Sequence, residues 1–239
     1  MISRMGYFTA AKRSLPIMTF MMLALLAAAC SGGSEQKTLD PESADELVHA
    51  ALLAPGDLPS GGWTTTANDD FTFELAPGAA CDSMRSLNAK LAENRVGRAQ
   101  RQLERNPGPT VELEIGAYKS SEGLSELLTS ASGLLGDASV NGCQAESVRL
   151  LRGDPTITLT PATPSISAPR NGFAFAVDID LPGPGGSRTA VHFETYIWLQ
   201  DNISIRAEIV ALKGVPVAEL ATTILQRLAT SVDNALEGK

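Results

Sequence analysis

The clearest pattern lies in the last third of the chain, where apolar and polar residues alternate along three segments. The segments cover about 173–181, 191–199 and 203–211, and their apolar side chains stand at odd-numbered positions. Alternation of this kind predicts β-strands with one face on a core. The short connections predict an antiparallel meander, and the apolar stripe that follows from Pro216 to about Leu236 predicts a helix.

The register of the last two strands depends on the turn between them. A two-residue turn at 201–202 would place Leu199 opposite Ser204 and turn the apolar face of one strand outward. A three-residue loop over 200–202 instead pairs Leu199 with Ile203 and keeps the apolar sets together. We therefore predict the three-residue loop, with the odd-numbered side chains of the meander on the core side.

Three further helices are predicted from apolar residues at helical spacing, over about 41–53, 82–93 and 121–135. Asp40 and Pro41 are good starting residues for the first helix, because aspartate can cap a helix and proline fits its first turn. Gly136 ends the third helix, and Cys143 is expected in a short loop behind it. A turn-rich loop at 53–63 follows the first helix.

Two strands are predicted before the meander. Alternation is strong over 110–118 and weaker over 96–105, and the turn residues of Asn106–Pro109 join the two segments. One or two short strands are expected within 147–159. Prolines interrupt the next segment, which we interpret as a surface loop over 160–171 because proline cannot stand in a central strand.

A short apolar run near the start of the chain has the marks of a secretion signal. It covers 17–29, ends in small residues before Cys30, and follows three basic residues, Arg4, Lys12 and Arg13. Its 13 residues are too few to span a bilayer, which takes about 20. The cysteine directly after the small residues resembles a bacterial lipoprotein signal. An ordinary signal peptidase site, leaving Cys30 unmodified, is the alternative.

The lipoprotein resemblance implies a particular organisation of the chain. The Cys30 thiol would receive a diacylglyceryl group, and the cleaved chain would begin at that cysteine, anchored to the cell membrane or outer membrane on its extracytoplasmic side. Residues 1–29 are then the signal peptide, 30–40 a flexible tether and 41–239 a single domain. We expect this domain to be α+β, with an antiparallel sheet of five to seven strands and helices packed on one face.

The cysteine count fits this interpretation. The chain has three cysteines, Cys30, Cys81 and Cys143. If Cys30 is lipidated, the other two can pair, and no odd thiol remains in an oxidising compartment. A Cys81–Cys143 disulfide is therefore predicted, since their distance in sequence excludes a C-x-x-C redox motif.

The charge of the cleaved chain limits its partners. The leader holds three of the 19 basic residues and none of the 27 acidic ones, so the remainder carries a net charge of −11. This argues against nucleic acid, whose phosphates require clustered lysine and arginine. It argues equally against charge-driven binding to an anionic lipid surface.

Motifs of the common enzyme classes are absent from the sequence. There is no G-x-S-x-G, H-E-x-x-H, P-loop or G-x-G-x-x-G before a helix. His49 and His192 have no metal-ligating partners at useful spacing, and Asp178-x-Asp180 lacks the later acidic residue of a calcium loop. We predict no cofactor, no metal and no enzymatic activity. An enzyme without a recognisable motif is the alternative.

One group of residues is a candidate ligand-binding face. With the predicted register, the even-numbered face of the meander brings Tyr196 beside Arg206 and Trp198 nearby, with His192 near Asp178. It also sets Glu194 opposite Glu208, a like-charge pair. Two large aromatics and an arginine exceed what a solvent face requires. Alternatively, the 160–171 loop or the N-terminal helix covers both aromatics.

The layout resembles the extracellular sensor-type domains of actinobacterial serine/threonine kinases and related envelope lipoproteins. The resemblance covers about 44–236 and rests on element order, the 53–63 loop and the position of Cys143 after the 121–135 helix. It implies a non-enzymatic domain that binds an undetermined envelope ligand or protein. A lipid or amphiphile carrier with an apolar cavity is the main alternative.

Overall fold

The computed structural model describes residues 39–66, 75–121, 124, 126, 127, 130 and 138–238. The predicted signal peptide, Cys30 and most of the predicted tether lie outside these residues. Of the helix predicted over 121–135, the described residues are helical and the rest lie outside as well. No helix within the described ranges is long and apolar enough to cross a membrane.

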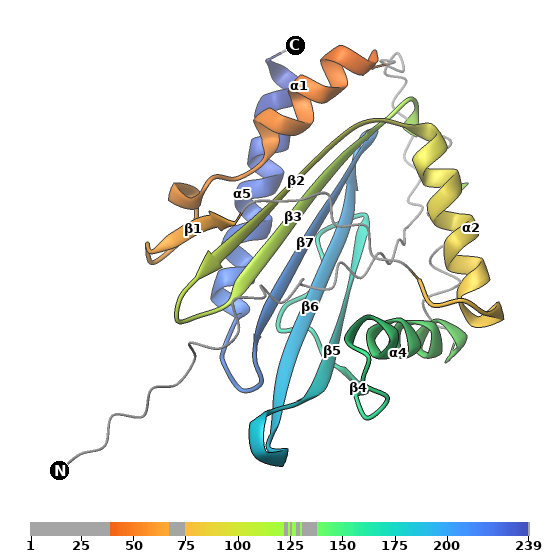
Figure 1. Cartoon of the computed structure of the whole chain (residues 1–239). Helices are drawn as coiled ribbons and strands as arrows, with labels where there is room; N and C mark the ends of the chain where they lie inside the picture. Colours follow the sequence, from red (N-terminus) through yellow and green to blue (C-terminus); the bar gives the residue numbers. More distant parts are fainter. Residues whose placement is uncertain are drawn as a thin grey trace.

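A single seven-stranded sheet forms the centre of the fold, in the order β1-β2-β3-β7-β6-β5-β4 with every neighbouring pair antiparallel (Figure 1). The strands are β1 (Trp63–Thr66), β2 (Arg95–Arg105), β3 (Thr110–Tyr118), β4 (Thr158–Ala162), β5 (Gly172–Pro182), β6 (Arg188–Gln200) and β7 (Ile203–Leu212). The predicted α+β class and strand number are confirmed. The pairing of β3 with β7 joins the early hairpin to the late meander.

Helices cover both faces of this sheet, whereas we expected them on one. Helices whose bounds lie within the described residues are α1 (Pro41–Ala51), α2 (Ala79–Asn94), α4 (Ala138–Arg152) and α5 (Ala218–Glu237), and short 3-10 turns lie at Pro55–Asp57 and Pro184–Gly186. Helices α1 and α5 pack together on what we call the first face (Figure 1). Helices α2 and α4 pack on the second face. The expectation failed because the meander has apolar side chains on both faces.

The turn between β6 and β7 has two residues, so the predicted register is wrong. Gln200 pairs with Ile203 and Trp198 with Ile205, across a turn in which Asp201 has a left-handed φ of 54°. Aspartate tolerates this conformation better than most residues, and such two-residue turns match the twist of the strands. A three-residue loop would be favoured only if one face of the meander met solvent. Helices cover both faces, so the two-residue turn exposes no apolar face.

The segment before β4 differs from the prediction. Cys143 lies inside α4 rather than in a loop, and the strands expected over 147–159 are replaced by the end of α4 and the start of β4. The buried positions of α4 include Cys143, Gln144, Ser147 and Val148, which have helical spacing but contain little apolar surface. The pattern of apolar residues alone therefore missed this helix. Strand β4 lies at the sheet edge, which is compatible with Pro161.

The predicted disulfide is present and joins the two helices of the second face. The sulfur atoms of Cys81 in α2 and Cys143 in α4 are 1.96 Å apart, and their Cα atoms are 5.0 Å apart. Both cysteines are buried, and Met84 packs beside them. Ser147 lies one helical turn from Cys143. Its hydroxyl accepts a hydrogen bond from the backbone N–H of Ala76 at 2.9 Å and donates one to the carbonyl of Cys143 at 2.8 Å. The bond therefore fixes α2 against α4.

Candidate functional site

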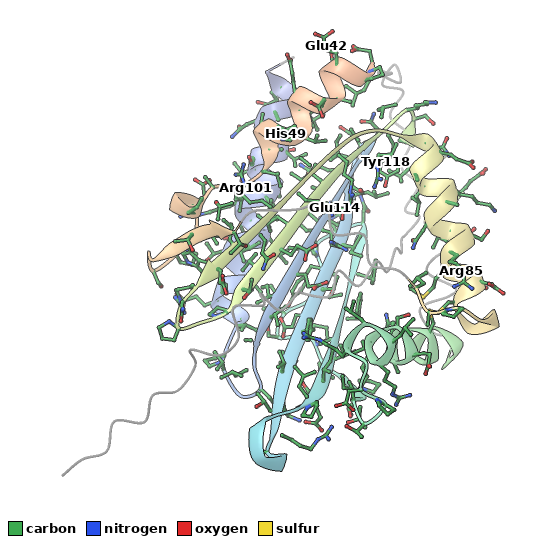
Figure 2. The ribbon with its side chains drawn as sticks, in the orientation of Figure 1. Glu42, His49, Arg85, Arg101, Glu114 and Tyr118 are labelled. Atoms are coloured by element: carbon green, nitrogen blue, oxygen red, sulfur yellow. A yellow bond between two sulfur atoms is a disulfide. The ribbon has the colours of Figure 1, made fainter. Side chains whose placement is uncertain are left out.

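A group of charged side chains is buried on the second face of the sheet, where an apolar core would be the ordinary arrangement. We call it the charged cluster: Arg98 on β2, Glu112 and Glu114 on β3, and Arg206 and Glu208 on β7. Glu112, Arg206 and Glu208 are all less than 9% exposed. Figure 2 labels Glu114 among the side chains of the sheet. Charged residues are rarely buried unless they are paired.

Strand pairing brings these residues together. Glu114 lies opposite Arg206 and Glu112 opposite Glu208 in the β3–β7 pair. The Nη2 atom of Arg206 contacts both Glu112 Oε1, at 2.7 Å, and Glu114 Oε2, at 3.2 Å. From the other side, Arg98 Nε donates to Glu114 Oε1 at 3.0 Å. The repulsion between the paired carboxylates of Glu112 and Glu208 is thus reduced by the guanidinium of Arg206, which contacts Glu112.

Further donors complete the environment of Glu114. Gln100 Nε2 donates to Glu114 Oε2 at 2.9 Å, and Arg95 Nη1 lies 3.6 Å from Glu114 Oε1. The side chains of Arg95 and Arg98 are 19% and 23% exposed, so they form the more open side of the cluster. The cluster therefore extends from a buried centre at Arg206 to a partly solvated row of donors on β2.

Electrostatics keep Glu114 and Arg206 ionised. Burial raises the pKa of Glu114, but Arg206 and Arg98 outweigh burial and hold this pKa at about 2. Burial lowers the pKa of Arg206, and the carboxylates of Glu114, Glu112 and Glu208 outweigh that effect and raise it. Neither group exchanges a proton near neutral pH. The cluster is suited to recognising polar or ionic groups, not to acid–base catalysis.

Apolar packing on the same face is concentrated elsewhere. Leu87 and Leu91 of α2 pack with Phe173 and Leu199, and Val148 of α4 packs with Phe193. These contacts lie over β5 and β6, whereas the charged cluster lies over β2, β3 and β7. The second face is therefore divided into an apolar half beneath α2 and α4 and a polar half beside it.

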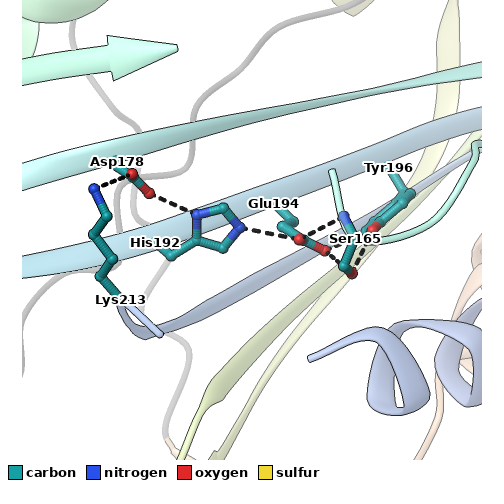
Figure 3. Close-up of polar contacts among 6 residues, drawn as sticks. All are labelled: Ser165, Asp178, His192, Glu194, Tyr196 and Lys213. Atoms are coloured by element: carbon teal, nitrogen blue, oxygen red, sulfur yellow. Dashed lines mark hydrogen bonds and ion pairs between the residues drawn. The ribbon is translucent and has the colours of Figure 1, made fainter. Parts of the chain in front are cut away.

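A second polar network lies on the first face, at the end of the meander. Figure 3 shows it as a row of side chains, which we call the His192 row: Lys213, Asp178, His192, Glu194, Tyr196 and Ser165. Lys213 Nζ lies 2.7 Å from Asp178 Oδ2, and the two nitrogens of His192 contact Asp178 at 2.7 Å and Glu194 at 3.0 Å. His192 and Asp178 are directly paired across β5 and β6.

The far end of the His192 row holds the loop after β4. Ser165 donates from its backbone N–H and its hydroxyl to the two oxygens of Glu194, both at 2.7 Å. Tyr196 Oη donates to Glu194 Oε2 at 2.6 Å. Ile166 packs against the first-face core next to this contact. The loop is thereby fixed over Tyr196.

The contacts in this row favour the cationic form of His192. Burial lowers its pKa, but the hydrogen bonds to Asp178 and Glu194 outweigh burial and raise it. Because both ring nitrogens face carboxylate oxygens, the ring is best satisfied when both nitrogens donate. An imidazolium held this way is neither a general base nor a metal ligand.

The structure separates the three residues predicted to form one ligand-binding face. Tyr196 and Trp198 are 0% and 3% exposed and belong to the first-face core, whereas Arg206 lies on the second face. The alternative, that the 160–171 loop covers the aromatics, is correct for Tyr196. The expected pairing of Glu194 with Glu208 is wrong, because Glu194 lies opposite Ile209.

Sequence reasoning missed Glu112 and Glu114 of the charged cluster. Glu112 and Glu114 alternate with apolar residues, which is the ordinary pattern of a strand with one solvent face. Only the pairing of β3 with β7 brings them to Arg206. One local signal was available. Arg206 and Glu208 stand at even-numbered positions of β7, as Glu112 and Glu114 do on β3, so charged side chains alternate with apolar ones on both strands.

No set of three or more histidine, cysteine or acidic side chains in the described ranges is placed to hold a metal ion. Asp178, His192 and Glu194 form a row with the imidazole between the carboxylates, so they do not converge on one point. Two hollows are polar or mixed in lining. One of about 300 Å³ lies between Leu53, Asp57 and α5, and another lies at the 163–168 loop.

Comparison with known proteins places the chain in no family. No family model matches it, and no curated protein does. Its fold is similar to the crystal structure of the extracellular domain of PknH from Mycobacterium tuberculosis, with 10% sequence identity and a TM-score of 0.48. The match covers 84% of this chain and 98% of that chain. A likeness this weak carries no argument about function.

Proposed function

We propose that the protein is an exported envelope lipoprotein, anchored through Cys30, whose single domain binds a ligand or a protein partner and performs no catalysis. The buried Cys81–Cys143 disulfide supports export, because such bonds persist in oxidising compartments and are rare in the cytosol. The apolar leader before Cys30 supports the lipid anchor. Both features come from different parts of the chain and favour the same compartment.

The charged cluster carries the binding part of the proposal. Burying an ion pair costs desolvation that a hydrophobic pair of similar volume would avoid. Three glutamates and two arginines occupy the middle of a sheet face whose other half is an ordinary apolar core. We interpret the polar half as a recognition surface, with Arg98, Arg95 and Gln100 as its more accessible donors.

The geometry of the titratable groups supports a non-enzymatic role. The pKa of Glu114 is held at about 2, and both ring nitrogens of His192 are engaged by carboxylates, so neither side chain is free to act as a general base. The Ser165 hydroxyl contacts Glu194 and Tyr196, and its hydrogen bond positions a loop. Neither described hollow is an apolar cavity, so the amphiphile-carrier alternative gains no support.

Thermal shifts with a fixed panel of amino acids, short peptides, sugars and phosphorylated metabolites test the binding surface. A ligand present at 100 times its Kd stabilises by about 2.7 kcal/mol, which raises Tm by about 5–10 °C for a domain of this size. Arg98→Gln should abolish the shift produced by a panel compound. Arg105→Gln is the matched control, since Arg105 ends the same strand but stacks on Trp63.

The two variants remove the same charge from the same strand, so an unspecific charge effect would change both equally. A compound that stabilises Arg98→Gln as much as wild type would place binding away from the charged cluster. Native mass spectrometry of protein from source-cell membranes supplies a second readout, because a bound ligand would be seen with wild type and lost with Arg98→Gln.

A further inference from the structure

The segment between α4 and β5 has a composition that the binding role does not use. Residues 155–169 read PTITLTPATPSISAP, with four prolines and six hydroxyl residues in fifteen positions. Thr158 and Thr160 lie in edge strand β4, and the remainder lies before or after it. All six serines and threonines are exposed, while Ile157 is buried and Leu159 and Ile166 are partly buried. The segment therefore presents a row of hydroxyls outward.

Serine- and threonine-rich sequence with proline is typical of O-glycosylated segments in exported proteins. Proline keeps the chain extended, so the neighbouring hydroxyls remain accessible to a transferase. The backbone here has that form, because exposed and partly buried residues alternate from Ala162 to Ala168. The same composition in a helix would not present its hydroxyls in this way.

Two of the six hydroxyls in this segment are engaged in hydrogen bonds to carboxylates. Ser165 Oγ lies 2.7 Å from Glu194 Oε2, and Thr156 Oγ1 donates to Asp154 Oδ1 at 2.6 Å. Among the described residues, no hydrogen bond engages the hydroxyls of Thr158 and Thr160, which lie in β4. The same holds, within those residues, for the hydroxyls of Thr163 and Ser167, which follow β4. Both residues line the open hollow of about 440 Å³ beside the loop. A sugar attached to either one would have space without displacing the fold.

We propose that Thr163 is an O-glycosylation site, with Ser167 as a second acceptor, and this rests on the proposed export of the chain. The donor would be a hexose linked to a polyprenyl phosphate. The bond between its anomeric carbon and the phosphate oxygen breaks, and a bond from that carbon to Thr163 Oγ1 forms. The hydroxyl proton passes to a base of the transferase, and the polyprenyl phosphate leaves.

A glycan at this place also suits the position of β4. An edge strand has unpaired backbone groups that can pair with another chain, and proteins protect such edges with prolines, charges or covering groups. Pro161 already lies in β4, where it offers no N–H to a further strand. A sugar on Thr163, one residue beyond the strand, would add a bulky hydrophilic group to the same edge of the sheet.

Mass spectrometry of tryptic peptides from protein purified from source-cell membranes tests the proposal. Arg152 and Arg170 are the nearest basic residues, so trypsin releases the whole segment as the peptide 153–170. We expect this peptide to carry at least one hexose, with fragmentation placing the first on Thr163. Thr163→Ala should remove it, while Ser165→Ala should leave it in place.

The outcomes separate this inference from the proposed function. Protein with lipid on Cys30 and a closed disulfide but an unmodified 153–170 peptide would overturn glycosylation and leave export intact. A sugar found only on Ser165 or Thr156 would contradict the structural choice of acceptor. Protein with free thiols and no lipid would overturn both proposals.

Discussion

Large side chains of neighbouring strands pack in an apolar core on the first face of the sheet and form ion pairs on the second. Trp198 and Tyr196 contribute apolar surface to the first face, and the Tyr196 hydroxyl also closes the His192 row. Arg206, eight residues further along the chain than Trp198, holds two carboxylates on the second face. The first face therefore stabilises the fold, and the second provides the polar surface proposed for binding.

Trp198→Ala should lower stability by about 3–5 kcal/mol, because the indole is buried in the main core and its loss leaves a cavity. Phe193→Ala, on the opposite face of the same strand, should be comparably costly, since Phe193 is also buried. Urea unfolding of both variants measures this. A Trp198→Ala protein as stable as wild type would show that the indole lies at the surface.

His192 should make stability depend on pH in a defined direction. Its pKa in the folded protein is raised above the ordinary value of 6.5. A raised pKa means that the folded state binds the proton more tightly, so this contribution is complete below about pH 6.5 and is lost as pH rises through the folded value.

Unfolding free energies measured from pH 6 to pH 9 in wild type and His192→Gln test the effect. The difference between the two proteins should shrink as pH rises. Lys213 and the carboxylates of Asp178 and Glu194 keep their charges over this range. A difference in unfolding free energy that stays constant would therefore show that the row does not favour the cationic form of His192. His49, on the exposed side of α1, provides the control as His49→Gln.

At the scale of elements, the approach of α1 to the sheet depends on one glycine. A Cβ atom added to Gly97 on β2 would lie 2.8 Å from the backbone carbonyl carbon of Ala44 in α1. Nearby, Arg101 Nη1 donates to the carbonyl of Leu53 at 2.8 Å, and Figure 2 labels this arginine on the same side of the molecule. Helix α1 is thus fixed by close backbone contact and by a charged donor at its C-terminal end.

Gly97→Ala should therefore destabilise the protein by about 1–3 kcal/mol, because α1 must move away from β2. Gly142→Ala is the matched control. Gly142 lies in α4 with nothing within 4 Å of an added Cβ, so alanine there should be neutral or stabilise by up to about 1 kcal/mol. Thermal melts that rank the two variants in the opposite order would contradict this account of the α1 contact.

Local patterns predicted most elements and failed where contacts distant in sequence decide the structure. The limits of β3 agree with the prediction, because alternation and a turn at Asn106–Pro109 are local signals. Helix α4 was missed because polar Gln144 and Ser147 occupy its buried side. The register of β6 and β7 was wrong because sequence alone did not show that helices would cover both faces.

The candidate site was predictable only in fragments, for the same reason. Arg206 and Tyr196 were selected as unusual residues on strands, and each does belong to a polar network. The two networks lie on opposite faces of the sheet. The predicted three-residue loop had shifted β6 by one residue against β7 and so had placed Tyr196 and Arg206 on the same face. The role of Glu112 and Glu114 required the β3–β7 pairing, which joins segments nearly a hundred residues apart.

At the scale of the whole molecule, the chain combines an acidic composition, a disulfide between α2 and α4, and a predicted signal peptide over residues 1–29. The charge disfavours nucleic acid as a partner, and the disulfide favours an oxidising compartment. These features are the grounds for the proposed location outside the cytoplasm and for the proposed binding of a ligand or protein partner.

Mass spectrometry of the protein extracted from source-cell membranes, under non-reducing conditions, tests this central claim most directly. The account predicts a mature chain that begins at Cys30 and carries a diacylglyceryl group there, with Cys81 and Cys143 in one linked pair of peptides. A chain that retains residues 1–29, or begins at an unmodified Cys30, would contradict the lipid anchor. Free thiols at Cys81 and Cys143 in that material would contradict export itself.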